Sequence, residues 1–161
     1  MDTKLSHVIE KAELYPVSHF QAFTFLMKRK GTSIIFVNDQ RKVLLLLRDD
    51  KPTIPYPNMW DVPGGHVDDG ETPEQCIVRE MKEEMDLTLE EFERLSVMEF
   101  TDRVEYTFWK RANLDIEKID LREGQRLRWF TELEARNSKL AYGFNEIIDD
   151  FFKKAAFFLT D

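Results

Sequence analysis

Residues 65–87 read GHVDDGETPEQCIVREMKEEMDL, and this stretch decides both the fold and the site of the chain. Glu83 and Glu84 follow Glu80 by three and four residues, so the three carboxylates are neighbours on a helix surface. Each like-charge pair in that arrangement destabilises the helix by about 0.2–0.5 kcal/mol. Divalent cations such as Mg2+ bind a few carboxylates together with substrate phosphates and would offset the repulsion. The stretch therefore predicts a metal site for a phosphorylated substrate, with a solvated acidic helix face as the alternative.

The start of this helix is marked by capping residues. Thr72 is a good N-cap, Pro73 suits the first helical position, and Gln75 stands where a capping-box partner belongs. These residues predict a helix that begins directly after Glu71. Apolar side chains recur beside the carboxylates at four-residue steps, namely Ile77, Met81 and Met85. We expect this apolar stripe to pack on the domain while the carboxylates line a cleft.

A short segment upstream ends in a glycine pair. Trp60 and Val62 indicate a short strand, which runs into Gly64 and Gly65. Because glycine has no side chain, a backbone carbonyl at this place can approach a metal or a phosphate closely. The loop and the helix therefore predict one shared site, with the Gly65 carbonyl as a metal ligand.

Taken together, these positions resemble the Nudix box, the signature of the Nudix hydrolases. The matching residues are Gly65, Glu71, Arg79, Glu80, Met81, Glu83, Glu84 and Leu87. The resemblance implies an enzyme that hydrolyses a phosphoanhydride with Mg2+ or Mn2+, which Gly65, Glu80, Glu83 and Glu84 would hold. Arg79 belongs to this catalytic group through its support of the site, since we expect it to pair with Glu71 and fix the loop against the helix.

One position departs from the Nudix pattern. Asp86 stands where the family usually has glycine, at a helix end that favours a left-handed backbone. Aspartate tolerates that conformation less well than glycine, and it adds negative charge at the negative end of the helix dipole. We expect a local cost in stability and an altered helix exit, with less effect on the ligand positions.

Composition is consistent with one enzyme domain over residues 1–161. The hydrophobic content of 42% supplies a core, and residues 1–13 predict a short polar helix or a flexible arm. A net charge of −8 disfavours binding to nucleic acid polymers or anionic membranes, so we expect a small nucleotide as partner. A single cysteine excludes an internal disulfide, and the polar start has no signal-peptide pattern. We therefore expect a cytoplasmic protein, either monomeric or homodimeric.

The chain predicts strands on both sides of the acidic helix. Residues 19–30, 32–39 and 42–48 are rich in branched and aromatic residues, and a proline-punctuated loop follows. Two strands between Phe92 and Ala112 turn at Thr101 and Asp102, and LRWF at 127–130 is another, before a polar segment, TELEARN. A closing amphipathic helix is indicated by Phe144, Ile147, Ile148, Phe151, Phe152, Ala155 and Phe158. This order predicts an α+β fold, and the resemblance implies a Nudix-type α/β/α sandwich with a mixed, partly antiparallel sheet.

Within the family the chain resembles the MutT-type nucleoside triphosphate pyrophosphohydrolases from about Lys42 to Phe151. That resemblance makes Arg48 a nucleotide contact, although a strand-end charge is the alternative. In FTDRVEYTFW, Phe100 and Arg103 become candidates for the base pocket, and both could equally be ordinary sheet residues. Glu123 in the Glu-Gly-Gln step would join the metal site as an extra catalytic glutamate, or be a solvated loop acid. Asn145 would read the purine, with helix capping as a strong rival.

These residues predict metal-assisted hydrolysis of a nucleoside triphosphate to a monophosphate and pyrophosphate. Glu83 or Glu123 would take the proton from water, and the MutT resemblance implies an oxidised guanine nucleotide, 8-oxo-dGTP, as substrate. One alternative is a Nudix hydrolase of ADP-ribose, nucleotide sugars or dinucleoside polyphosphates. A second is a nucleotide-binding module without turnover. A third, a diphosphate isomerase, would need a cleft cysteine, and Cys76 on the helix is poorly placed for that role.

Overall fold

The computed structural model describes residues 28–159; residues 1–27 and 160–161 lie outside the described range. The arm predicted at 1–13 and most of the strand predicted at 19–30 therefore fall outside it. The last residues of that strand do appear, because strand β1 begins at Arg29. Within the described range, no helix is long enough and apolar enough to cross a membrane.

Within residues 28–159, seven strands form one mixed sheet, which confirms the predicted sheet type. The strands are β1 (Arg29–Val37), β2 (Val43–Leu47), β3 (Trp60–Asp61), β4 (Gly64–His66), β5 (Glu93–Glu99), β6 (Arg103–Arg111) and β7 (Arg126–Phe130). The order is β3-β2-β1-β6-β5, with β4 also paired to β1 and β7 to β2. The β1–β6 pair is parallel, and the other strand pairs are antiparallel.

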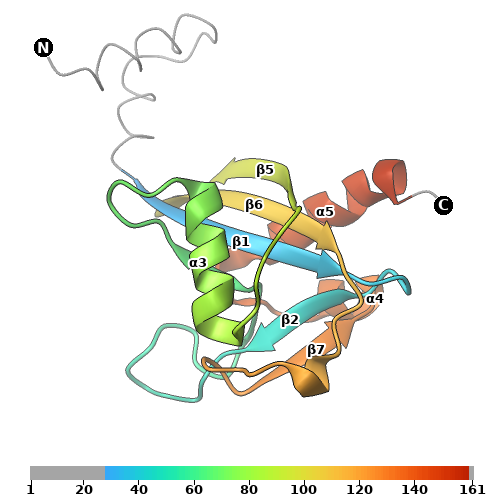
Figure 1. Cartoon of the computed structure of the whole chain (residues 1–161), viewed down its shortest axis with the longest axis horizontal. Helices are drawn as coiled ribbons and strands as arrows, with labels where there is room; N and C mark the ends of the chain where they lie inside the picture. Colours follow the sequence, from blue (N-terminus) through green and yellow to red (C-terminus); the bar gives the residue numbers. More distant parts are fainter. Residues whose placement is uncertain (1–27, 160–161) are drawn as a thin grey trace, which may run out of the picture.

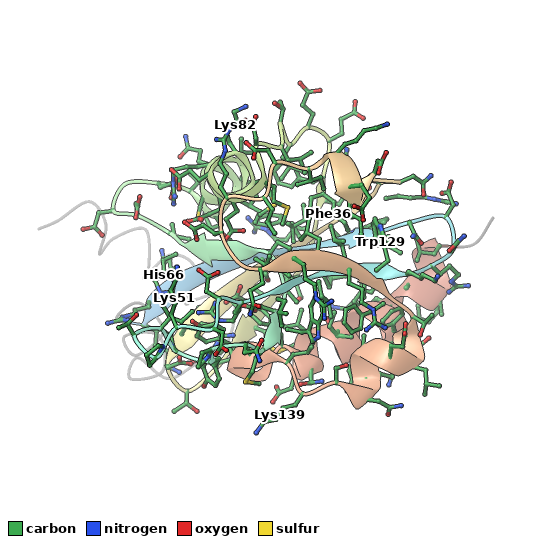
Figure 2. All side chains as sticks on the ribbon, turned by 90° about the horizontal axis from the view of Figure 1, so that it is seen from below. Phe36, Lys51, His66, Lys82, Trp129 and Lys139 are labelled. Atoms are coloured by element: carbon green, nitrogen blue, oxygen red, sulfur yellow. The ribbon has the colours of Figure 1, made fainter. Side chains whose placement is uncertain are left out.

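Helices cover both faces of the sheet, as Figures 1 and 2 show. Successive residues of a strand point to opposite faces, and in β1 both faces are buried. Ile34 and Phe36 pack towards α3 (Pro73–Met85), whereas Ile35 and Val37 pack towards α5 (Asn145–Phe158). The continuous apolar runs of β1 and β2 thus supply the core of an α/β/α sandwich, and the predicted fold class is confirmed.

The acidic helix α3 begins as its capping residues predict. Thr72 accepts a hydrogen bond from the backbone N–H of Gln75, and the Gln75 side chain accepts one from the backbone N–H of Thr72. The apolar stripe of Ile77, Met81 and Met85 is fully buried against the sheet. Because this buried stripe holds α3 against the sheet, the backbone positions that carry the adjacent carboxylates are fixed.

The C-terminal third contains one helix more than the sequence pattern predicted. The segment TELEARN, expected to be merely polar, forms α4 (Glu132–Asn137) behind Thr131, whose capping box with Glu134 is a signal that sequence reasoning overlooked. Short 3-10 turns lie at η1 (Ile116–Lys118) and η2 (Ala141–Gly143). The closing helix α5 is confirmed, with Ile147, Ile148, Phe151, Phe152 and Ala155 buried.

Candidate active site

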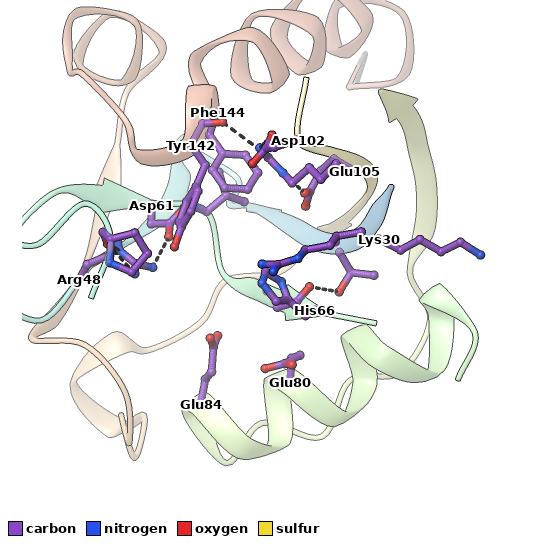
Figure 3. Close-up of a pocket in the computed structure, with 18 of the residues that line it drawn as sticks. Lys30, Arg48, Asp61, His66, Glu80, Glu84, Asp102, Glu105, Tyr142 and Phe144 are labelled. Atoms are coloured by element: carbon purple, nitrogen blue, oxygen red, sulfur yellow. Dashed lines mark hydrogen bonds and ion pairs between the residues drawn. The ribbon is translucent and has the colours of Figure 1, made fainter. Parts of the chain in front are cut away.

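A cleft of about 480 Å³ lies where α3, the β3–β4 segment, the loop before β7 and the η2 turn meet (Figure 3). Its acidic end is lined by Gly65, Glu80, Glu84 and Glu123. Its other end, the aromatic end, is lined by Arg48, Asp61, Arg103, Glu105, Tyr142 and Phe144. These ten residues come from segments that lie far apart in the sequence, so the fold itself assembles the cleft.

Glu84 is the most constrained carboxylate of the acidic end. Its side chain is buried, and within residues 28–159 no hydrogen-bond partner reaches Oε2. Burial raises the pKa of Glu84 to about 9, and the negative charges of Glu80, Glu123 and Asp61 act in the same direction. A backbone hydrogen bond from Gly64 opposes this shift only in part. An unpaired buried carboxylate among like charges is unfavourable by itself, and a divalent cation would satisfy it.

The donor set fits a magnesium-type ion rather than a closed metal cage. Within the described part of the chain, no three Asp, Glu, His or Cys side chains already stand together as ligands for one ion. Mg2+ is usually held by one or two carboxylates, with waters and substrate phosphates completing its shell. Glu80 and Glu84 supply such carboxylates from one helical step, and Glu123 faces them from the loop before β7. The residues present therefore fit a hard divalent cation.

Gly65 is required by the position of Glu80. A Cβ at Gly65 would lie 2.3 Å from the carboxylate carbon of Glu80, well inside any real contact. The Glu80 carboxylate thus lies directly against the backbone of β4. This arrangement brings together two of the predicted metal ligands, the Gly65 carbonyl segment and Glu80.

Arg79 fastens the loop to the helix, as the sequence predicts. Its Nε and Nη2 donate to the two carboxylate oxygens of Glu71 at 2.9 and 3.0 Å, and Nη2 also donates to the His66 carbonyl at 3.1 Å. Its Nη1 donates to Glu80 at 2.9 Å and to Glu83 at 3.0 Å. The Arg79 hydrogen bonds lower the pKa of Glu71 to about 2. Arg79 therefore orients the carboxylates and does not itself line the cleft.

Glu83 is more exposed than the other predicted ligands on α3. Its side chain is 57% exposed and contacts Arg79, and it is not among the described residues that line the cleft. Glu123, in contrast, is brought to the acidic end although it lies far along the chain. Of the two glutamates predicted as proton acceptors, the fold thus places Glu123 in the cleft and Glu83 at its outer side.

The loop that carries Glu123 is fixed on both sides. Arg122 donates its backbone N–H to the carbonyl of Glu84 at 2.7 Å. Gly124 has a φ of +83°, and a Cβ there would lie 2.7 Å from Leu46, so glycine alone fits between the loop and β2. Because its neighbours are held in this way, the backbone of Glu123 has little freedom.

Asp86 adopts the left-handed conformation that the family glycine would take, with φ 50° and ψ 30°. Its backbone N–H donates to the Lys82 carbonyl at 3.1 Å, so the helix ends in the expected place. Its carboxylate pairs with Lys82 at 2.5 Å and Arg122 at 3.2 Å, and these contacts lower its pKa. Two cations thus offset the charge that we expected to be unfavourable at this helix end.

Arg48 is held tightly at the aromatic end. Nη1 donates to Asp61 at 2.9 Å, while Nε and Nη2 donate to the Pro55 carbonyl at 3.1 and 2.9 Å. The guanidinium also lies over the Tyr142 ring, 5.0 Å from its centroid. Burial raises the pKa of Asp61 to about 6, against the opposing effect of Arg48. The predicted nucleotide contact therefore enters the cleft with a fixed orientation.

Arg103 is buried and contacts several neighbours at once. Nε donates to Glu105 at 2.7 Å, Nη2 donates to the Tyr142 carbonyl at 3.0 Å, and the guanidinium stacks 4.2 Å from the centroid of Phe100. Arg103 lines the cleft. Phe100 lies behind it, packed on the core under α5, and is not among the described lining residues.

Asn145 uses both ends of its amide within the fold. Oδ1 accepts from the backbone N–H of Leu140 at 3.0 Å, and Nδ2 donates to the Ser138 carbonyl at 2.7 Å. Among the described residues it is not a lining residue of the cleft. These bonds brace the turn before α5, and its role in base recognition stays a prediction.

Sequence reasoning overlooked several lining residues, among them Asp61, Glu105 and Tyr142. Asp61 on β3 and Glu105 on β6 are acids within strands, and both are almost fully buried. That pattern is the usable signal, since a buried acid in a strand needs a partner or a function. Tyr142 has a positive φ of 54° in an otherwise ordinary turn, and no feature of its sequence context marks it.

Comparison with known proteins identifies the family of the chain. A family model described as NUDIX domain matches residues 27–151. The 8-oxo-dGTP diphosphatase of Escherichia coli is 36% identical over 77 residues, which are 46% of this chain and 59% of that protein. The RNA pyrophosphohydrolase of Histophilus somni (strain 2336) is 34% identical over 102 residues, which are 63% of this chain and 48% of that protein. The chain therefore spans less than two thirds of the length of these curated relatives.

Solved structures show the same fold. A MutT structure from a study of Aliivibrio salmonicida and Vibrio cholerae aligns with a TM-score of 0.65 at 22% identity, covering 79% of this chain and 98% of that chain. The NUDIX domain of Shewanella oneidensis NrtR, in complex with ADP ribose, aligns with a TM-score of 0.65 at 16% identity, covering 86% and 99%. At such identities the likeness concerns the fold alone.

Proposed function

This chain belongs to the Nudix family, and we propose that it hydrolyses a nucleoside triphosphate to a nucleoside monophosphate and pyrophosphate with the help of Mg2+ or Mn2+. The observation that carries the proposal is the buried Glu84 carboxylate, which has an unpaired oxygen and lines a cleft together with Glu80 and Glu123. A polyphosphate bridged by a cation would be the natural occupant of such an end.

The acidic end would hold the cation through Glu80, Glu84 and the Gly65 carbonyl, with Glu123 and Glu83 contributing from either side. The ion would neutralise charge on the phosphates and acidify the attacking water. Arg79 keeps Glu80 and the loop in place through its contacts with Glu71 and the His66 carbonyl. Preorganised carboxylates of this kind spare the reaction the cost of ordering them later.

Glu123 is the proton acceptor that the cleft geometry favours. Water attack on a phosphorus atom breaks a phosphoanhydride bond and releases one proton, which a carboxylate near that water must accept. Glu123 lines the cleft, whereas Glu83 is exposed and paired with Arg79. We therefore assign Glu123 the role of general base, and Glu83 a supporting role at the metal.

The aromatic end would bind the nucleoside. Arg48 offers a fixed guanidinium whose planar fork suits phosphate or a purine edge, and Tyr142 and Phe144 offer ring surfaces. Phe100 would contribute through its stack with Arg103, and Asn145 through the turn that it braces. The relative named 8-oxo-dGTP diphosphatase favours an oxidised guanine nucleotide as the substrate.

Product analysis tests this function against its alternatives. The purified protein is incubated with Mg2+ and a panel of normal and oxidised nucleoside triphosphates, ADP-ribose, nucleotide sugars and dinucleoside polyphosphates. Pyrophosphate release from a triphosphate is the expected result. Cleavage confined to the diphosphate-linked compounds would reject the triphosphate as substrate in favour of that class of compound. Binding without cleavage would indicate a nucleotide-binding module. We also propose that the protein is a monomer or a homodimer and that it is located in the cytoplasm.

A further inference from the structure

Glu105 presents an unused carboxylate oxygen at the aromatic end of the cleft. It lies on β6, is 2% exposed, and lines the cleft across from Glu80 and Glu84 (Figure 3). Its Oε2 accepts a hydrogen bond from Arg103 Nε at 2.7 Å. Within residues 28–159 no hydrogen-bond partner reaches Oε1. Half of this buried carboxylate is therefore satisfied, and the other half is not.

The position of the carboxylate is fixed by its surroundings. In the parallel β1–β6 pair Glu105 stands opposite Gly31, where an added Cβ would lie 2.5 Å from Oε2. Arg103 is itself held by the Tyr142 carbonyl and by stacking on Phe100 and Phe144. Because both partners are immobilised, Oε1 cannot turn to solvent without breaking this set of contacts.

No neighbouring group fully accounts for Oε1. The Ser33 hydroxyl is near enough to favour the ionised form of Glu105, but among the described residues it makes no hydrogen bond to Oε1. It shares a 3.1 Å hydrogen bond with the Thr107 hydroxyl, in which either group can be the donor. The ion pair with Arg103 explains only Oε2. A buried acceptor left without a donor costs free energy, so a carboxylate in this state is expected where a ligand completes it.

The surroundings favour a flat ring with an N–H group. Tyr142 and Phe144 supply aromatic surface, and a carboxylate oxygen accepts hydrogen bonds but donates none. The phosphates belong to the acidic end, where the cation would lie, so the base is the part of the substrate that reaches Glu105. Guanine-type bases carry ring and amino N–H donors on one edge.

We propose that Glu105 determines base specificity by accepting a hydrogen bond from an N–H group of a guanine-type base. The inference rests on the proposed function, since it takes the ligand to be a nucleotide with its phosphates at the acidic end. It assigns a role that neither the Nudix box nor the predicted substrate contacts contain.

The Glu105→Gln variant gives a directional test. The amide oxygen must accept from Arg103 Nε, which is a donor, so the amide NH2 group would replace Oε1. A donor would then face the donor of the base, and preference for guanine should be lost or reversed. Glu93→Gln makes the same chemical change at an exposed position of β5 and is the matched control.

Binding is measured with non-hydrolysable triphosphate analogues of guanosine and of purine riboside, whose base has no N–H donor. We expect the wild type and Glu93→Gln to prefer guanosine by about tenfold or more, the worth of a charge-assisted hydrogen bond. The Glu105→Gln ratio should fall to about one or below. The binding preference of the wild type tests the proposal even if the variant fails to fold. A thermal melt shows whether the Glu105→Gln variant is folded.

The outcomes separate this inference from the proposed function. An unchanged ratio in a folded Glu105→Gln protein, or a wild type without preference, would overturn the role of Glu105. Guanosine preference lost in the variant, in a protein that hydrolyses none of the nucleotides, would support Glu105 and reject the hydrolase. A wild type that binds neither analogue would contradict both.

Discussion

The backbone N–H of Arg122 donates a hydrogen bond to the carbonyl oxygen of Glu84, 2.7 Å away. Glu84 lies in the last turn of α3, and Arg122 directly precedes Glu123 in the loop before β7. This hydrogen bond thus joins α3, which carries the buried Glu84 carboxylate, to the loop that carries the Glu123 carboxylate. The Arg122 side chain adds a 3.2 Å contact to Asp86, just past the helix end.

Replacing Asp86 with glycine, the residue usual in the family, should separate stability from activity. Glycine removes the strain of the left-handed conformation, while the two exposed ion pairs that are lost each contribute less than about 1 kcal/mol. We expect the free energy of unfolding in urea to change by less than about 1 kcal/mol. Turnover should fall several-fold, because the loop that carries Glu123 loses the Asp86–Arg122 contact.

The Asp86→Asn variant controls for backbone strain, since asparagine tolerates the left-handed conformation but lacks the charge. It should lose turnover to the same extent as Asp86→Gly. Wild-type turnover in both variants would show that Asp86 has no part in positioning Glu123.

Replacing Gly65 with alanine should damage the site while leaving the fold intact. The new Cβ would lie 2.3 Å from the Glu80 carboxylate carbon, so the flexible Glu80 side chain must move. We expect Mg2+-dependent turnover to drop by about 10–100-fold, as when the support of a metal ligand is lost. Gly70→Ala is the matched control: of the described residues, none has an atom within 4 Å of its new Cβ, yet its φ is +82°. Gly70→Ala should lose stability but keep turnover. Wild-type turnover in Gly65→Ala together with reduced turnover in Gly70→Ala would refute the assignment of Gly65.

Acid should weaken the Glu71–Arg79 pair over a defined pH range. The pKa of Glu71 is lowered from its ordinary value of 4.5 to about 2 by the Arg79 hydrogen bonds. Because the folded-state pKa is the lower one, the stabilisation is fully present above pH 4.5 and is lost as the pH falls through about 2. Urea unfolding of the wild type and Glu71→Gln should therefore differ most above pH 4.5 and converge near pH 2. A difference that stays constant across this range would contradict the ion-pair account.

Asn145 should prove more important for stability than for substrate choice. Its amide bonds two backbone groups of the turn before α5, so Asn145→Ala should lower the free energy of unfolding by about 1–3 kcal/mol. Asn137→Ala, at an exposed position of α4, should change it by less than about 0.5 kcal/mol. Relative kcat/KM values for guanine and adenine nucleotides should match the wild type. A selective loss with guanine would restore the predicted role in base recognition.

Local patterns were sufficient to predict most of the fold. The apolar runs of β1 and β2, the capping box at Thr72 and the periodicity of α5 each reflect interactions between residues close in sequence. Helix α4 was missed because its six residues show no long apolar period, although its Thr131–Glu134 capping box was visible. The left-handed Asp86 was anticipated, but the cations that offset its charge were not, since Arg122 lies on a distant loop.

The site was predictable only in part, because burial is a property of the assembled fold. Spacing on one helix placed Glu80 and Glu84 together, yet it could not show that Glu83 is exposed and lies outside the lining of the cleft. Asp61 pairs with Arg48 from beyond the end of β2, and Glu105 stands opposite Gly31 of β1, so the residues next to each acid in the sequence do not reveal its surroundings. The aromatic end therefore became visible only from tertiary contacts, whereas the spacing of the glutamates on α3 already predicted the acidic end.

The magnesium dependence of nucleoside triphosphate hydrolysis by Glu84→Gln tests directly whether the buried Glu84 carboxylate binds the divalent cation. The substitution keeps the shape of the side chain and removes the buried charge that the cation would neutralise, while Glu90→Gln makes the same change at an exposed loop position. We expect turnover at saturating Mg2+ to fall by on the order of 100-fold or more in Glu84→Gln and to be unchanged in Glu90→Gln. Wild-type turnover with an unaltered Mg2+ requirement in a folded Glu84→Gln protein would contradict the account.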